Sequence, residues 1–189
     1  MFPAPFRVVV DACALIPASL CDTLLRAAAA GYFQIYWSRE ILEETRRNLV
    51  SQLGLTDEKA AKRCMAMHKH FPEAMVIEYE RYIDAMENDP KDRHVAAAAL
   101  KAGAQVIVTS NVRDFKKLPE GVEAQIPDEF LCNLFELNRS RMVALVKAQA
   151  AALQQPRVTW EQLLGGLATV VPEFAAAVKA HAAHPAPQR

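Results

Sequence analysis

The sequence of 189 residues carries 22 acidic and 22 basic side chains, so its formal net charge is zero, and 52% of its residues are hydrophobic. This balance excludes a polycation that binds nucleic acid through its overall charge, so any such contact would be local or would depend on a partner. The N-terminal sequence lacks the pattern of a secretory signal, there is no apolar run of 18 residues, and the four cysteines form no CxxC pair. We therefore expect a soluble, cytoplasmic protein that makes no contact with a membrane.

Short apolar runs typical of buried strands alternate with helical patterns along the first two thirds of the chain. Ser38 and Thr56 are predicted N-caps of two helices, and Asp89 followed by Pro90 is predicted to open a third helix. This alternation predicts an α/β fold, a doubly wound sandwich with a central parallel sheet. The predicted strands cover residues 6–10, 33–37, 75–79, 105–110 and 122–126.

From Asp128 onward the sequence shows helical patterns alone. We predict one long helix over 128–153, a break at Pro156 and shorter helices after it. The predicted domains are therefore an α/β domain over 6–132 and a helical C-terminal extension over 133–189, which would pack on the first domain or bind a partner.

Three aspartates follow predicted strands or begin a predicted helix. Asp11 follows the first strand, Asp114 follows the strand over 105–110, and Asp92 lies in the first turn of the helix that Asp89 caps. Each has an ordinary explanation, Asp11 as an N-cap and the other two as acids that favour a helix dipole, with Asn111 as the cap beside Asp114. Together they would meet at one edge of a parallel sheet, where their mutual repulsion favours a bound cation. Ligands that are all oxygen suit Mg²⁺ or Mn²⁺.

A fourth acid is less well defined by the sequence. Glu43 and Glu44 both lie off the apolar face of the helix over 39–53, so periodicity leaves both of them open, and a solvated charge explains either one. His94 lies beside the predicted acid cluster and is a weaker candidate for contact with substrate.

Several other classes of site lack support in the sequence. No GxGxxG, Walker, GxSxG or HExxH motif is present, which argues against nucleotide-binding, acyl-transfer and zinc-protease sites. A phosphoryl-transfer receiver domain also clusters aspartates on a doubly wound sheet, but the strand over 75–79 is not followed by the required Asp.

Four segments of the sequence resemble the PIN-domain family over residues 6–132. They are VVVDACAL, LEETRRNL, DPKDRHVAAAALKAGAQVIVTSNVRDF and IPDEFL. The pattern is similar to that of VapC-type toxins of toxin–antitoxin pairs, and the helical region after Asp128 resembles a longer subgroup of these toxins.

The resemblance implies a divalent-metal-dependent ribonuclease. Its motifs assign catalytic roles to Asp11, Glu44, Asp92 and Asp114, and they favour Glu44 over Glu43. Asp11, Asp92 and Asp114 would bind the Mg²⁺ or Mn²⁺ ion, and Glu44 would hold a second ion or orient the attacking water.

The resemblance also implies contacts with RNA and with other proteins. Ser110 and Asn111 match a polar pair at the strand end, and basic side chains nearby would bind phosphates. A small antitoxin would cover the acidic pocket and insert an Arg or Lys between the carboxylates, and the resemblance also allows a homodimer. The alternative function is a catalytically weak binding module that acts through its helical extension in RNA processing or regulation. The basic side chains expected to bind RNA phosphates are Lys91, Arg93, Arg113, Lys116 and Lys117.

Overall fold

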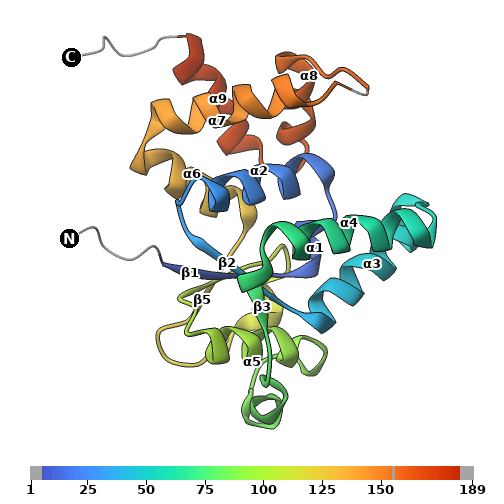
Figure 1. Ribbon diagram of the computed structural model, residues 1–189. Coiled ribbons are helices and arrows are strands. Elements are labelled where there is room, and N and C mark those ends of the chain that lie inside the picture. Colours follow the sequence, from blue (N-terminus) through green and yellow to red (C-terminus); the bar gives the residue numbers. More distant parts are fainter. Residues whose placement is uncertain (1–5, 155, 184–189) are drawn as a thin grey trace. The chain divides into compact units, whose positions relative to one another are not determined.

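A computed structural model describes residues 6–154 and 156–183 of the chain (Figure 1). The described residues fall into two compact units. The first, here called the sheet unit, contains residues 6–16 and 33–126, and the second, here called the helical unit, contains residues 17–32 together with those after 126. The chain therefore leaves the sheet unit after its first strand and returns to it at the second.

The sheet unit is built on a parallel sheet of five strands in the order β3-β2-β1-β4-β5. The chain steps outward from β1 to β3 and then returns to the other side of β1, so the strand order reverses between β1 and β4. This is the topological switch point at which doubly wound sheets carry their ligands. The strands are β1 (Arg7–Val10), β2 (Gln34–Ser38), β3 (Met75–Val76), β4 (Val106–Val108) and β5 (Glu123–Gln125).

The central strands are apolar along their whole length because both of their faces are covered. Val8, Val9 and Val10 of β1 are fully buried, as are Ile107 and Val108 of β4. Continuous burial of this kind is what a parallel sheet between helices requires. The predicted α/β fold with a central parallel sheet flanked by helices is confirmed.

Four α-helices belong to the sheet unit. Ser38 and Thr56 cap α3 and α4 as predicted, because their side chains accept hydrogen bonds from backbone N–H groups of the first turns. Helix α5 packs against the sheet, where it contacts β1, β2 and β4, and α4 packs on α3 (Figure 1). The helices are α1 (Ala12–Leu15), α3 (Arg39–Leu53), α4 (Asp57–His70) and α5 (Arg93–Ala102).

Short 3₁₀ segments replace parts of the predicted regular structure. The strand predicted over 75–79 is only two residues long, and Glu78 adopts a positive φ of 59° that ends extended structure. The helix predicted to open at Pro90 is interrupted, because Asp92 lies at φ −107° and ψ 5°, and α5 begins one residue later. The 3₁₀ segments are η1 (Pro72–Ala74), η2 (Glu80–Ala85), η3 (Pro90–Asp92) and η4 (Val112–Phe115).

The helical unit places α2 from the N-terminal region among the helices from the C-terminal region. Thr23 of α2 donates a hydrogen bond to Gln149 of α7 at 2.8 Å, and both side chains are fully buried. The single long helix predicted over 128–153 is wrong, because Asn138 leaves the helical conformation at φ −160° and caps α7 instead. The helices are α2 (Ala18–Ala29), α6 (Pro127–Leu137), α7 (Arg139–Ala152), α8 (Trp160–Ala168) and α9 (Pro172–Ala183).

The second segment of the helical unit begins at Pro127, a few residues before the predicted domain boundary. The division after residue 132 stays a prediction, and residues 184–189 of the predicted extension lie outside the described residues. Within the described part of the chain, no helix combines the length and apolar character needed to cross a membrane.

Candidate active site

Asp11 lies at the carboxyl end of β1, where its backbone N–H donates to Val108 of β4 at 3.0 Å. The side chain is 4% exposed and caps α1, because Oδ1 accepts from the backbone N–H of Ala12 at 2.7 Å. Oδ2 accepts from Thr109 at 2.7 Å and from the thiol of Cys13 at 3.1 Å. Burial raises the pKa of Asp11, although these hydrogen bonds partly offset the effect. Oδ1 therefore acts as the predicted N-cap. Oδ2 takes no part in capping and is held instead by Thr109 and Cys13.

Asp92 occupies the N-cap position of α5 but forms no capping hydrogen bond. Its side chain is buried, and Oδ2 accepts no hydrogen bond from any described residue. Burial raises the pKa of Asp92 to about 6, and the negative charges of Asp11 and Asp114 add to this effect. Asp92 thus lies at the start of α5, where an acid favours the helix dipole, but its carboxylate accepts no hydrogen bond from a helix N–H group.

Asp114 lies in η4, just after β4, and its backbone carbonyl accepts from the N–H of Asp89 at 3.0 Å. This bond ties the loop after β4 to the segment that carries Asp92. Lys91 places its ammonium 2.9 Å from Asp114 Oδ2 and 3.8 Å from Asp92 Oδ2. The Asn111 cap expected beside Asp114 is not formed, because no side-chain hydrogen bond caps η4.

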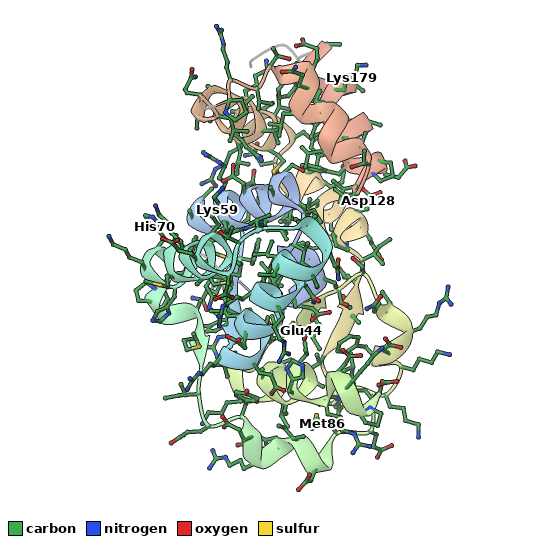
Figure 2. All side chains as sticks on the ribbon, turned by 90° about the vertical axis from the view of Figure 1, so that its right-hand side faces the viewer. Glu44, Lys59, His70, Met86, Asp128 and Lys179 are labelled. Carbon is green, nitrogen blue, oxygen red and sulfur yellow. The ribbon has the colours of Figure 1, made fainter. Side chains whose placement is uncertain are left out.

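The two adjacent glutamates of α3 have different surroundings. Glu43 is exposed and pairs with Arg46 at 3.0 Å. Glu44, labelled in Figure 2, is half-buried, and its Oε2 lies 3.6 Å from Nε2 of His94 in α5. The contact with His94 is the largest cause of a pKa of Glu44 below its ordinary value. Of these two glutamates, Glu44 is the one whose negative charge raises the pKa of Asp11. The geometry thus distinguishes two residues that helical periodicity left equivalent, and the catalytic role of Glu44 stays a prediction.

His94 is a buried residue of this site that sequence reasoning ranked low. Burial alone would lower its pKa, but the carboxylates of Glu44 and Glu40 and the charge of Asp11 outweigh burial, so the pKa of His94 is raised. The raised pKa favours the imidazolium form, which suits a ring that lies among several carboxylates.

Thr109 and Cys13 were absent from the predicted site, although both hold Asp11. Thr109 is fully buried at the end of β4, and its hydroxyl also accepts from the N–H of Asn111 at 3.1 Å. Burial raises the pKa of the Cys13 thiol to about 11, so this thiol stays protonated and donates to Asp11. The one feature of the sequence that could have indicated a role for Thr109 is its polar side chain directly after the three apolar residues of β4. Its partner lies 98 positions away in the sequence.

The residues predicted to contact RNA lie around the acids. Ser110 and Asn111 are exposed at the end of β4, and Arg93 is directed to the Asn88 carbonyl at 3.4 Å. A cleft of about 250 Å³ opens beside Asp114, and Arg113 is part of its lining. The other residues that line it are Glu87, Asn88, Asp89, Lys116 and Lys117.

The negative charges of Asp11 and Asp114 both raise the pKa of Asp92, but the three carboxylates do not converge on one point. Among the described residues, no three Asp, Glu, His or Cys side chains are close enough to hold a single ion as they stand. The chemistry of the donor set nevertheless fits a hard divalent cation, because the donors are all oxygen and Asp92 Oδ2 is buried without a hydrogen-bond donor.

Comparison with known protein families identifies the fold. The family model described as PIN domain matches residues 7–113, and the one described as VapC50 C-terminal domain matches residues 127–180. The first match spans more than half of the chain, and the protein belongs to the PIN-domain family. The two matches together confirm the predicted resemblance to VapC-type proteins with a helical C-terminal extension.

One similar protein is "Putative ribonuclease VapC50" of Mycobacterium tuberculosis. It is 38% identical over 106 residues, which are 54% of the present chain and 63% of that protein. The match therefore covers less than two thirds of the relative's length. No solved structure matches the chain.

Proposed function

We propose that this protein is a divalent-metal-dependent endoribonuclease that hydrolyses RNA phosphodiester bonds. The observation that carries the proposal is the buried carboxylate of Asp92, whose Oδ2 accepts no hydrogen bond and whose neighbours include Asp11 and Asp114. The Lys91 ammonium, 3.8 Å from Oδ2, only partly offsets the burial of this acid, because the pKa of Asp92 is still raised to about 6. A buried acid of this kind is costly, and a bound cation would reduce that cost. Membership of the PIN-domain family and the name of the similar mycobacterial protein, which describes a ribonuclease, support the same activity.

Asp11, Asp92 and Asp114 would hold Mg²⁺ or Mn²⁺. When bound, such a metal supplies neutralisation of the phosphoryl charge and a lowered pKa for the attacking water. The protein's contribution is to hold the carboxylates in place. Thr109 and Cys13 fix Oδ2 of Asp11, and the hydrogen bond between Asp89 and Asp114 keeps the loop after β4 beside Asp92.

Glu44 would orient the attacking water, because it lies at the edge of the cluster with its carboxylate half-buried and charged. Arg113, Lys116 and Lys117 would bind RNA phosphates along the cleft beside Asp114. This local group of cations would allow RNA binding by a chain whose net charge is zero.

The protein would act as the toxin of a type II toxin–antitoxin pair, and a small antitoxin would neutralise it. The contact between the Lys91 ammonium and Asp114 at 2.9 Å supports this mode of inhibition, because it shows that the acids accept a basic side chain. An antitoxin Arg or Lys would compete in the same way with the metal and with RNA.

The test is cleavage of a mixed set of single-stranded and structured RNAs with Mg²⁺ or Mn²⁺ by the wild type, Asp92→Asn and the matched exposed control Asp84→Asn. We expect the wild type and Asp84→Asn to cut, and Asp92→Asn to lose at least about 100-fold in rate with its fold intact. An inert wild type, or an Asp92→Asn variant that cuts equally well, would overturn the proposal. Equal growth inhibition by wild type and Asp92→Asn in cells would instead favour a binding module.

A further inference from the structure

His94 lies between two carboxylates of one helix. Its Nε2 is 3.6 Å from Glu44 Oε2, and its Nδ1 is 3.8 Å from Glu40 Oε2. Glu40 and Glu44 are one turn apart on α3, whereas His94 is the second residue of α5. The ring therefore contacts α3 from α5, on the side of α3 that carries Glu40 and Glu44.

The ring is held where it is by its surroundings. His94 is 7% exposed, and the residues that follow it in α5, Val95 and Ala96, are fully buried. Glu40, on the far side of the ring, also accepts a hydrogen bond from the hydroxyl of the buried Tyr79 at 3.4 Å. The arrangement thus runs from Tyr79 through Glu40 and His94 to Glu44.

Glu44 has little else to fix its position. Among the described residues, His94 is the only ion-pair partner of Glu44, whereas its neighbour Glu43 is turned outward to Arg46. A glutamate side chain has three rotatable bonds, so a half-exposed carboxylate without a partner would sample several positions. A catalytic group has to be held within a fraction of an ångström of its working position.

We propose that His94 is a positioning residue that holds the Glu44 carboxylate toward Asp11 and so fixes the group that orients the attacking water. The inference rests on the proposed nuclease function, and it adds a residue that no motif of the chain had assigned. On the opposite edge of the ring, Nδ1 forms no hydrogen bond with any described residue and lies 3.8 Å from Glu40 Oε2, so Glu40 contributes through its charge.

The first experiment tests the contact without any need for activity. The ¹⁵N shifts of the His94 ring are measured in the wild type, in Glu44→Gln and in the matched control Glu43→Gln. We expect Glu44→Gln to move the Nε2 signal of His94 and Glu43→Gln to leave it unchanged. Equal spectra for the two variants would overturn the proposal, whether or not the protein cuts RNA.

The second experiment tests whether His94 acts through Glu44. Cleavage rates are compared for His94→Leu, His94→Gln, Glu44→Gln and the double variant His94→Leu with Glu44→Gln. We expect His94→Leu to lower kcat by roughly 10–100-fold with KM nearly unchanged. His94→Gln, which keeps an N–H donor, recovers part of the loss, and His94→Leu has almost no further effect in the Glu44→Gln background.

A merely structural role predicts a different pattern. His94→Leu would then lower the rate by the same factor in both backgrounds, together with a lower Tm, and this result would overturn the proposal. His68→Leu on the exposed face of α4 serves as the control for loss of a histidine. Failure of the wild type to cut any RNA would overturn the nuclease function and with it the catalytic purpose of His94, whereas the ring ¹⁵N shifts would still decide whether His94 contacts Glu44.

Discussion

Two buried aspartates, one in each unit of the molecule, are equally covered and yet have opposite surroundings. Asp92 in the sheet unit and Asp128 in the helical unit are each 8% exposed. Asp128 accepts hydrogen bonds from the backbone N–H groups of Glu173 and Phe174 at 3.0 and 2.8 Å, so both of its oxygens are satisfied at the start of α9 (Figure 2). Asp92 stands at the start of α5 with no capping bond and with Oδ2 unsatisfied.

The difference separates an acid that stabilises the fold from an acid that costs stability. A buried charge is kept without full compensation mainly where function requires it. Asp128 acts within the helical unit as an N-terminal cap for α9, while Asp92 is left available for a ligand. The comparison predicts that removing the two carboxylates will have effects of opposite sign on stability.

The largest expected effect on stability comes from Asp128→Ala. The change leaves the buried N–H of Phe174 without its acceptor, so the free energy of unfolding in urea should fall by about 3 kcal/mol. Glu129→Ala, at an exposed neighbouring position, should change it by less than about 0.5 kcal/mol. Similar free energies of unfolding for the two variants would contradict the claim that Asp128 stabilises the fold by capping α9.

Two fully buried threonines allow the same comparison between a polar group that serves the candidate site and one that stabilises the fold. Thr109 donates to Asp11 in the sheet unit, and Thr23 donates to Gln149 in the helical unit. Thr109→Val should lower the rate of RNA cleavage by roughly 10–100-fold, because Asp11 loses the hydroxyl that orients it. Thr23→Val should cost about 1 kcal/mol of stability and leave cleavage unchanged. The pair is compared by initial rates and urea unfolding, and equal loss of activity would show that the hydroxyl of Thr109 has no special role.

Asp92→Asn should stabilise the metal-free protein at neutral pH. The pKa of Asp92 is raised from 3.8 to about 6, so the folded state binds the proton more tightly than the unfolded state does. The associated stability is fully present below pH 3.8 and is lost as the pH rises through about 6. After allowance for solvent screening, the variant should be more stable than the wild type by about 1 kcal/mol at pH 7.5 and equal to it near pH 3.5. Urea unfolding in EDTA at both pH values measures this, and a variant that is less stable at pH 7.5 would contradict the account.

The smallest effect concerns Lys91. Its positive charge lowers the pKa of Asp92, so Lys91→Met should move that pKa above about 6. A ¹³C carboxyl titration of the metal-free protein measures the change, with Lys62→Met as an exposed control on α4. An unchanged titration would mean that the 3.8 Å contact of Lys91 with Asp92 is not populated in solution.

Much of the fold follows from local patterns in the sequence. The apolar runs of β1 and β4 and the caps Ser38 and Thr56 depend on residues close together in the chain, and the structure confirms them. The break at Asn138 was missed because the residues on both sides of it favour a helix, although asparagine is a preferred N-cap and its side chain accepts from the nearby N–H of Arg141.

The candidate site was less accessible to sequence reasoning. The positions of Asp11 and Asp114 follow from where the strands end, whereas the surroundings of Glu44 depend on the contact between α3 and α5. Periodicity gives the angle of a side chain around its own helix, but it does not say which partner the side chain meets. For the same reason, the roles of Thr109 and His94 became visible only in three dimensions.

The most direct test of the account is the effect of Mn²⁺ on thermal unfolding, since it requires no RNA substrate. We expect Mn²⁺ at 100 times its Kd to raise the Tm of the wild type and of Asp84→Asn by roughly 5–10 °C. Asp92→Asn should start from a higher Tm in EDTA at pH 7.5 and gain almost nothing from the metal. An Asp92→Asn variant that Mn²⁺ stabilises as much as the wild type, or a wild type that Mn²⁺ does not stabilise, would contradict the claim that this buried carboxylate serves to bind a metal.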